Sequence, residues 1–194
     1  MKIPISIKEY RKFYIATAIQ KVLEVFYKYP EKEFSLSDLA KEAGVAKANL
    51  GDVLSELEKL NMIQIEKLSK IWRIKANRTN WTYIRSKIVY NLNFIYQGGL
   101  VEFLVNSYNN PKTIILFGSF RKGEDISSSD IDIAIEKEDS KEYKILGLRQ
   151  LQEFEKEIGR RIQIHEFSRN SIEVSVFNAI ANGIVLFGFL EVKK

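Results

Sequence analysis

An apolar run that ends in a Gly-Ser pair constrains this chain more than any other feature. Residues 113–117 are β-branched or apolar, and Gly118 and Ser119 follow directly. Such a run predicts a buried strand that ends in a tight turn. Gly118 would let the backbone approach a ligand closely, because glycine carries no Cβ. The outward amides of the turn, the Ser119 hydroxyl and the charges of Arg121 and Lys122 form a candidate cradle for a phosphate chain.

Two aspartates follow about ten residues later in the chain. Asp130 and Asp132 alternate with Ile131, Ile133 and Ile135, which predicts a strand with the isoleucines in the core and both carboxylates on the other face. Adjacent carboxylates repel one another, and Mg²⁺ prefers such ligands together with substrate phosphates. A phosphate cradle beside paired carboxylates favours nucleotidyl or phosphoryl transfer with Mg²⁺ or Mn²⁺ as cofactor.

These motifs resemble those of the polymerase-β-like nucleotidyltransferases, in particular the small minimal nucleotidyltransferase domains of prokaryotes. The signature of that family is a strand, Gly-Ser, a basic stretch ending in Gly, and then Ser-Asp-x-Asp on the next strand. The matching positions are Gly118, Ser119, Lys122, Gly123, Ser129, Asp130 and Asp132. The resemblance covers roughly residues 110 to 190. It implies that a nucleoside triphosphate, with ATP as the first candidate, is bound by Gly118, Ser119, Arg121, Lys122 and Ser129.

The third expected strand departs from the family pattern. Residues 160–167 alternate, with Ile162 and Ile164 on one face and Gln163 and His165 on the other. Active relatives usually carry a third Asp where this chain has Gln163. Glutamine can offer an oxygen to a metal, but it adds no negative charge and cannot act as a base. His165 is the candidate base because histidine exchanges a proton near neutral pH, and a partly exposed structural histidine is the alternative.

Length and composition limit the class of protein. A chain of 194 residues with 45% hydrophobic content can form one large or two small domains. Cysteine is absent, which excludes disulfide and thiol chemistry. The chain starts without an apolar leader, and no apolar run is long enough to span a bilayer. We therefore expect a soluble cytoplasmic protein with no membrane partner.

The first part of the chain predicts three helices and a hairpin. Residues 7–29 form an amphipathic pattern that ends at Pro30, and a second helix is expected from Ser37 as its N-cap. Residues 47–60 predict a third helix with its apolar face at Leu50, Val53, Leu54, Leu57 and Leu60. Segments 62–67 and 71–75 predict the hairpin. Residues 36–64 resemble the winged helix-turn-helix family, with Ala43-Gly44-Val45 as the turn.

The charge distribution indicates an anionic partner for this first part. Residues 1–78 hold 15 Lys and Arg against 10 Asp and Glu, whereas residues 79–194 hold 15 of each, so the net charge of +5 lies in the first part. Helix-turn-helix proteins place the second helix of the pair in the major groove of duplex DNA and the wing along its backbone. The candidate DNA contacts are Lys47 and Asn49 on the helix and Lys67, Lys70, Arg73 and Lys75 on the wing. Asp52 and Glu56 would repel phosphates, so a winged helix that docks a protein is the alternative.

A helical connector is expected between the two parts. Within residues 80–97, an apolar stripe at spacings of three and four predicts a buried helix face, formed by Trp81, Ile84, Ile88, Leu92 and Ile95. The stripe packs either within the protein or against a second copy, so a homodimer is a secondary prediction. Further helices are expected at residues 143–158 and 171–182.

The sequence therefore predicts an α+β protein. Its parts are a winged helix-turn-helix domain over residues 1–78, a connector over residues 79–109 and a mixed α/β nucleotidyltransferase-fold domain over residues 110–194. The leading function is Mg²⁺-dependent transfer of a nucleoside monophosphate to a hydroxyl of a protein or nucleic acid, with Asp130 and Asp132 as catalytic metal ligands. The alternative is a catalytically weakened regulator or antitoxin-type protein. Minimal nucleotidyltransferases often act beside a small helical protein in toxin–antitoxin pairs, so the resemblance also implies such a partner.

Overall fold

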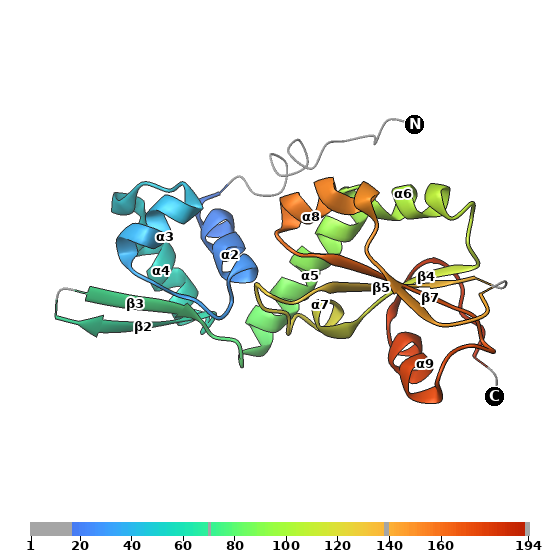
Figure 1. Ribbon diagram of the computed structural model, residues 1–194. Coiled ribbons are helices and arrows are strands. Elements are labelled where there is room, and N and C mark those ends of the chain that lie inside the picture. The colour runs from blue at the N-terminus through green and yellow to red at the C-terminus, as the bar shows by residue number, and fades with distance from the viewer. Residues whose placement is uncertain (1–16, 70, 138–139, 193–194) are drawn as a thin grey trace. The chain divides into compact units, whose positions relative to one another are not determined.

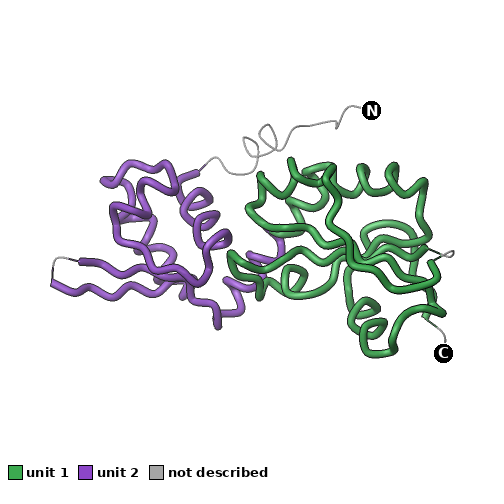
Figure 2. Tube along the Cα trace, viewed as in Figure 1, with its two compact units in different colours: residues 1–6, 91–194 green, residues 7–90 purple. Residues whose placement is uncertain are grey.

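The computed structural model describes residues 17–69, 71–137 and 140–192. The described residues form two compact units, 17–90 and 91–192, which meet inside helix α5 (Trp81–Gln97) (Figures 1 and 2). The expected connector helix thus contributes to both units. The expected three-part division stays a prediction.

Helix α2 (Ala18–Lys28) begins at a capping box. The Thr17 hydroxyl accepts a hydrogen bond from the Gln20 amide at 3.3 Å, and the Gln20 side-chain oxygen accepts one from the Thr17 amide at 3.0 Å. Within the described residues, the helix expected over residues 7–29 begins at Ala18 and ends at Lys28. Residues 7–16 lie outside the described residues.

The next two helices begin differently from the prediction. Helix α3 (Leu36–Ala43) is capped by Ser35 rather than Ser37, because the Ser35 hydroxyl accepts from the Asp38 amide at 3.1 Å. The expected third helix is a 3₁₀ turn, η1 (Lys47–Asn49), followed by α4 (Leu50–Lys59). Leu60 was expected on the buried face but is 52% exposed, because α4 ends one residue before it.

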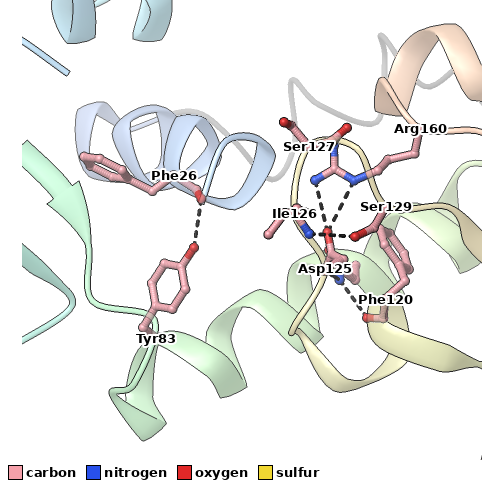
Figure 3. Close-up of polar contacts among 9 residues, drawn as sticks. Phe26, Tyr83, Phe120, Asp125, Ile126, Ser127, Ser129 and Arg160 are labelled. Atoms are coloured by element: carbon pink, nitrogen blue, oxygen red, sulfur yellow. Dashed lines mark hydrogen bonds and ion pairs between the residues drawn. The ribbon is translucent and has the colours of Figure 1, made fainter. Parts of the chain in front are cut away.

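A small antiparallel sheet completes the first unit. Strands β2 (Ile63–Leu68) and β3 (Ile71–Ala76) form the expected hairpin, and the two-residue strand β1 (Glu33–Phe34) pairs with β3, giving the order β1-β3-β2. Strand β1 was not predicted, because two residues are too short to show a period. The core contains Val22, Phe26, Leu39, Leu50, Leu54, Leu57 and Ile74. Tyr83 of α5 joins it and donates a hydrogen bond to the Phe26 carbonyl at 2.8 Å (Figure 3).

The buried face of α5 differs from the predicted stripe. Trp81 is 70% exposed, whereas the fully buried positions include the polar residues Lys87 and Asn91. Ile95 is buried as expected. The prediction was wrong for Trp81, whereas Ile84, Ile88 and Leu92 are half-buried. It followed apolar residues alone and so missed the two polar side chains on the buried face.

The second unit is built on a five-stranded mixed sheet in the order β6-β7-β5-β4-β8. The strands are β4 (Thr113–Phe117), β5 (Ile131–Glu136), β6 (Lys144–Leu146), β7 (Ile162–Phe167) and β8 (Ile184–Gly188). Strands β5 and β7 are parallel, and the other pairs are antiparallel. The predicted strand over residues 113–117 matches β4 at both ends.

Helices cover both faces of this sheet. Helices α6 (Leu100–Ser107) and α8 (Gln152–Ile158) lie on one side, and α9 (Val174–Ala181) lies on the other (Figure 1). Ile180 of α9 packs in a cluster with alternate residues of β4, β5 and β7, namely Ile115, Phe117, Ala134 and Phe167. By alternation, the isoleucines of β5 and β7 face the opposite side. Among the described residues, no helix is both long and apolar enough to cross a bilayer.

Residues 143–158 do not form the single helix that their spacing predicted. Residues Lys144–Leu146 form the edge strand β6, which pairs antiparallel with β7, and a 3₁₀ turn η2 (Arg149–Leu151) leads into α8. The residues paired with the open edge of β7 instead of forming a helix, because Gly147 interrupts the helical spacing of their apolar side chains. The last helix, α9, begins at Val174 rather than Ser171, and β8 follows it.

Candidate active site

The two aspartates lie together at the start of β5. Asp130 directly precedes the strand and Asp132 is its second residue, whereas Ile131 and Ile133 are fully buried. The Asp130 and Asp132 side chains are 25% and 24% exposed. Asp132 is the register partner of Phe117, the last residue of β4. Strand pairing therefore brings the aspartates to the Gly-Ser segment that follows β4.

Gly118 lies directly against the Asp132 carboxylate. Its φ is +75°, and a Cβ added there would be 2.2 Å from Oδ2 of Asp132. Both the left-handed backbone and the close approach require glycine at this position. Oδ2 of Asp132 thus packs against the main chain of Gly118, where a Cβ would otherwise lie.

The remaining phosphate-cradle candidates lie on a short helix, α7 (Gly118–Lys122), rather than in a simple turn. Ser119 and Arg121 are half-buried. Lys122 is exposed, and its Nζ lies 4.0 Å from an oxygen of Glu124. The Ser129 hydroxyl accepts a hydrogen bond from the Ile126 amide at 2.9 Å, so its oxygen closes the loop that carries Asp130.

A buried ion pair stabilises the loop that precedes β5. Arg160 Nη2 lies 3.0 Å from Asp125 Oδ2, with side-chain exposures of 4% and 0% (Figure 3). Asn91 Nδ2 donates to Asp125 Oδ1 at 2.9 Å and to the Phe120 carbonyl at 2.8 Å. These contacts tie α5, α7 and the start of β7 to the loop before β5. Sequence reasoning missed all three polar residues, because nothing local relates positions 91, 125 and 160.

Strand β7 presents one nitrogen to each aspartate. Gln163 Nε2 donates to Asp130 Oδ2 at 2.5 Å, and His165 Nε2 lies 3.1 Å from Asp132 Oδ1. The exposed Arg161 adds a third nitrogen, with its Nε 3.5 Å from Asp130 Oδ1. The structure therefore brings Asp130, Asp132, Gln163 and His165 together, as their alternation predicted.

The environment of His165 corrects one sequence-based alternative. His165 is only 6% exposed, so it is not a partly exposed strand histidine. The Phe117 ring meets it edge-on at 4.8 Å between centroids, and its Nδ1 hydrogen-bonds the Tyr143 hydroxyl. Burial raises the pKa of Tyr143, and the negative charge of Asp132 raises that pKa further. Tyr143 was missed because its segment was assigned to a helix.

The side chains present here suit one magnesium ion when phosphates complete its ligands. Within the described part of the chain, no three His, Asp or Glu side chains form a group that could hold a metal ion. Two carboxylates with substrate phosphates are nevertheless a usual protein contribution to Mg²⁺ binding. Gln163 turns its amide nitrogen toward Asp130, and rotation of that amide would offer its oxygen instead.

The described candidate DNA contacts lie on both faces of the hairpin and on η1. Arg73 and Lys75 lie on one face of the hairpin near acidic residues: Arg73 is 4.0 Å from Glu33 and 3.9 Å from Glu66, and Lys75 is 3.9 Å from Glu33. Lys67 lies over the Trp72 ring at 4.5 Å, on the opposite face by register. Lys47 donates to the Ser37 hydroxyl at 2.9 Å, and Asn49 is exposed at the end of η1. Lys70 lies outside the described residues.

Comparison with known proteins gives one family match, in the second unit. Residues 100–189 match the family model of the polymerase beta nucleotidyltransferases, which supports the nucleotidyltransferase part of the sequence-based resemblance. No curated protein matches the chain. One similar solved structure is the heme sensor protein PefR from Streptococcus agalactiae in complex with heme, with 16% identity and a TM-score of 0.34 over 53% of this chain and 67% of that one. This score is too low to indicate a shared fold.

Proposed function

We propose that the nucleotidyltransferase domain transfers a nucleoside monophosphate from a nucleoside triphosphate, with ATP as the first candidate, to a hydroxyl of a protein or nucleic acid. The observation that carries this proposal is the contact between the Gly118 main chain and the Asp132 carboxylate, with Asp130 beside it. A phosphate can reach two carboxylates there without meeting a side chain at position 118. Such an arrangement requires a cation between the carboxylates and the phosphates.

Each residue of the site has a role in this proposal. Asp130 and Asp132 would hold Mg²⁺ or Mn²⁺, which when bound offsets the phosphate charge and polarises the reacting phosphoryl group. Gly118 and Ser119 would bind the triphosphate, and Ser129 holds the loop beside it. Arg121 and Lys122 would offset its negative charge, for which Lys122 must leave Glu124. That exchange costs little, because exposed ion pairs contribute about 0–1 kcal/mol.

Gln163 makes this a slow enzyme. Its amide stabilises Asp130, but it supplies no third negative charge and no base for the attacking hydroxyl. We therefore expect binding of the metal–nucleotide complex to be retained better than transfer. The acceptor must therefore help to orient its own attacking hydroxyl, a task that the third carboxylate performs in other enzymes of this kind.

Transfer of label from α-labelled ATP tests the proposal. The chain is incubated with each nucleoside triphosphate and with Mg²⁺ or Mn²⁺, and binding is followed by calorimetry. The double variant Asp130→Asn with Asp132→Asn should lose both transfer and metal-dependent binding. The double variant Glu102→Gln with Glu153→Gln removes two exposed carboxylates of the same unit and should behave as wild type. Unchanged Mg-ATP affinity in the aspartate variant would exclude the site.

Residues on the hairpin of the first unit favour a second candidate function. We propose that this unit is a winged helix whose partner is duplex DNA or a protein. The pairing of Arg73 and Lys75 with acidic side chains weakens the case for DNA, and the exposed apolar residues Leu68 and Ile71 at the hairpin end favour a protein. In this alternative the chain is a regulator or antitoxin-type protein with a weakened transferase fold. A small helical protein or a second copy of the chain is then the partner to test in pull-down and sedimentation experiments.

A further inference from the structure

The two nitrogens of β7 reach the two carboxylates of β5 with a regular offset. In the parallel register, Gln163 is opposite Asp132 and His165 is opposite Ala134. Each β7 side chain nevertheless contacts the carboxylate two residues nearer the start of β5: Gln163 reaches Asp130, and His165 reaches Asp132. Both side chains are displaced by two residues in the same direction. We take this shared offset as a sign that β7 orients both aspartates.

The carboxylate of Asp132 decides which ring nitrogen of a neutral His165 carries the proton, because a carboxylate only accepts hydrogen bonds. The Tyr143 hydroxyl, which can donate or accept, is therefore the donor to Nδ1 of His165. A neutral imidazole that accepts at Nδ1 carries its proton at Nε2. Nε2 faces Oδ1 of Asp132 at 3.1 Å, so the ring donates to the carboxylate. The chain of donors thus runs from Tyr143 through His165 to Asp132.

We propose that Tyr143 and His165 are positioning residues that fix the Asp132 carboxylate. The hydrogen bond from His165, which Tyr143 orients, occupies Oδ1, and Oδ2 is the oxygen beside Gly118 that would bind the cation with the triphosphate. The value of this arrangement to catalysis rests on the proposed function, whereas the hydrogen-bond chain exists without it. Partners that orient a metal-binding side chain change metal affinity or activity by about 10- to 100-fold when removed.

This role replaces the one that the sequence assigned to His165. A base must reach the proton of the attacking hydroxyl. In the structure both ring nitrogens of His165 already have partners, and the ring is buried against Phe117. His165 therefore acts on Asp132 and not on the acceptor.

Nitrogen NMR tests the chain of hydrogen bonds directly, because His165 is the only histidine in the sequence. In the full-length protein at neutral pH, we expect one protonated nitrogen at Nε2 and one unprotonated nitrogen at Nδ1. Tyr143→Phe removes the donor to Nδ1 and should shift the Nδ1 signal toward that of an unprotonated nitrogen without a hydrogen bond, while Asp132 keeps the proton on Nε2. Tyr108→Phe is the matched control, because it removes a phenol that donates at 2.7 Å to Glu166 of the same strand. A proton on Nδ1 in the wild type, or an unchanged signal in Tyr143→Phe, would overturn the inference.

Two substitutions of His165 test its effect on the site. Glutamine places an N–H close to the position of Nε2, whereas asparagine places one close to Nδ1. His165→Gln should keep Mg-dependent nucleotide binding within a few-fold of wild type, and His165→Asn should weaken it by about 10- to 100-fold. Equal binding by the two variants would argue against a positioning role. If the wild type itself binds no metal–nucleotide complex, the proposed function fails, and the NMR result still decides whether the chain of hydrogen bonds exists.

Discussion

Replacing Gly118 by alanine should separate the function of the site from the stability of the fold. A left-handed backbone costs a residue with a Cβ about 1–2 kcal/mol. The new Cβ would also lie 2.2 Å from Asp132 Oδ2 and 3.1 Å from its Cγ, so the carboxylate must retreat. Turning Asp132 away from its preferred rotamer costs roughly 0.5–1.5 kcal/mol. The total of about 1.5–3.5 kcal/mol leaves a domain of ordinary stability folded.

The effect on the site should be much larger. Reaching an ordinary contact requires the carboxylate to move by about 1 Å, which breaks its hydrogen bond with His165 and moves it away from the cation. Misplacement of a reacting group by about 1 Å can lower activity roughly 100-fold. We therefore expect Gly118→Ala to lower nucleotidyl transfer to that extent, measured with α-labelled ATP, and to weaken Mg-dependent binding in calorimetry.

Gly159→Ala is the matched control. Gly159 ends α8 with a φ of +70°, and a Cβ there meets nothing within 4 Å. The control therefore carries the left-handed cost without the collision. Both variants should melt at lower temperature, by about 4–8 °C per kcal/mol for a domain of this size. If Gly118→Ala binds Mg-ATP as tightly as Gly159→Ala does, the space beside Asp132 is not where the nucleotide binds.

Three further predictions concern other parts of the molecule. Gln163→Asp should raise transfer, because it restores a third carboxylate, and should lower the melting temperature without metal; unchanged rates would show that position 163 is not the missing ligand. Asp125→Asn should lower the free energy of unfolding by about 3–5 kcal/mol, because it removes the negative charge that faces the buried Arg160 guanidinium, whereas Lys122→Gln should change it by less than about 1 kcal/mol; equal denaturation midpoints would contradict this. If the first unit binds DNA, Lys67→Glu with Arg73→Glu should weaken binding to all sequences and reduce its salt dependence; absence of salt-dependent binding by the wild type would favour a protein partner.

Short-range patterns predicted the centre of the site because strand alternation acts within a few residues. The period of two at Asp130 and Asp132 placed both carboxylates on one face, and the apolar run before Gly118 gave β4 its bounds. Strand pairing alone then brought the two motifs together. The phosphate and metal candidates of the second unit could therefore be found without knowledge of the fold.

The same reasoning failed where the structure depends on contacts between residues far apart in the sequence. Tyr143 lies just before β6, a strand that exists because the edge of β7 was available, and the apolar spacing of residues 145–158 predicted a helix instead. The buried pair of Asp125 and Arg160 joins residues 35 positions apart in the chain. Polar residues on a buried helix face, such as Asn91, likewise cannot be distinguished from exposed ones by hydropathy. The supporting contacts of the site were therefore invisible until the fold was known.

If Gln163 takes the place of a third carboxylate, it changes how the site can exist without a metal. Three carboxylates at one place repel one another strongly and need a resident cation. In this chain Asp130 is stabilised by the Gln163 amide and by Arg161, and Asp132 is stabilised by His165, so two negative charges are held by nitrogen donors alone. Under the proposed function, the cation would be needed only when the triphosphate adds its own negative charge. Metal and nucleotide should therefore bind as one unit, which is consistent with a slow transferase and equally with a regulator that senses the metal–nucleotide complex.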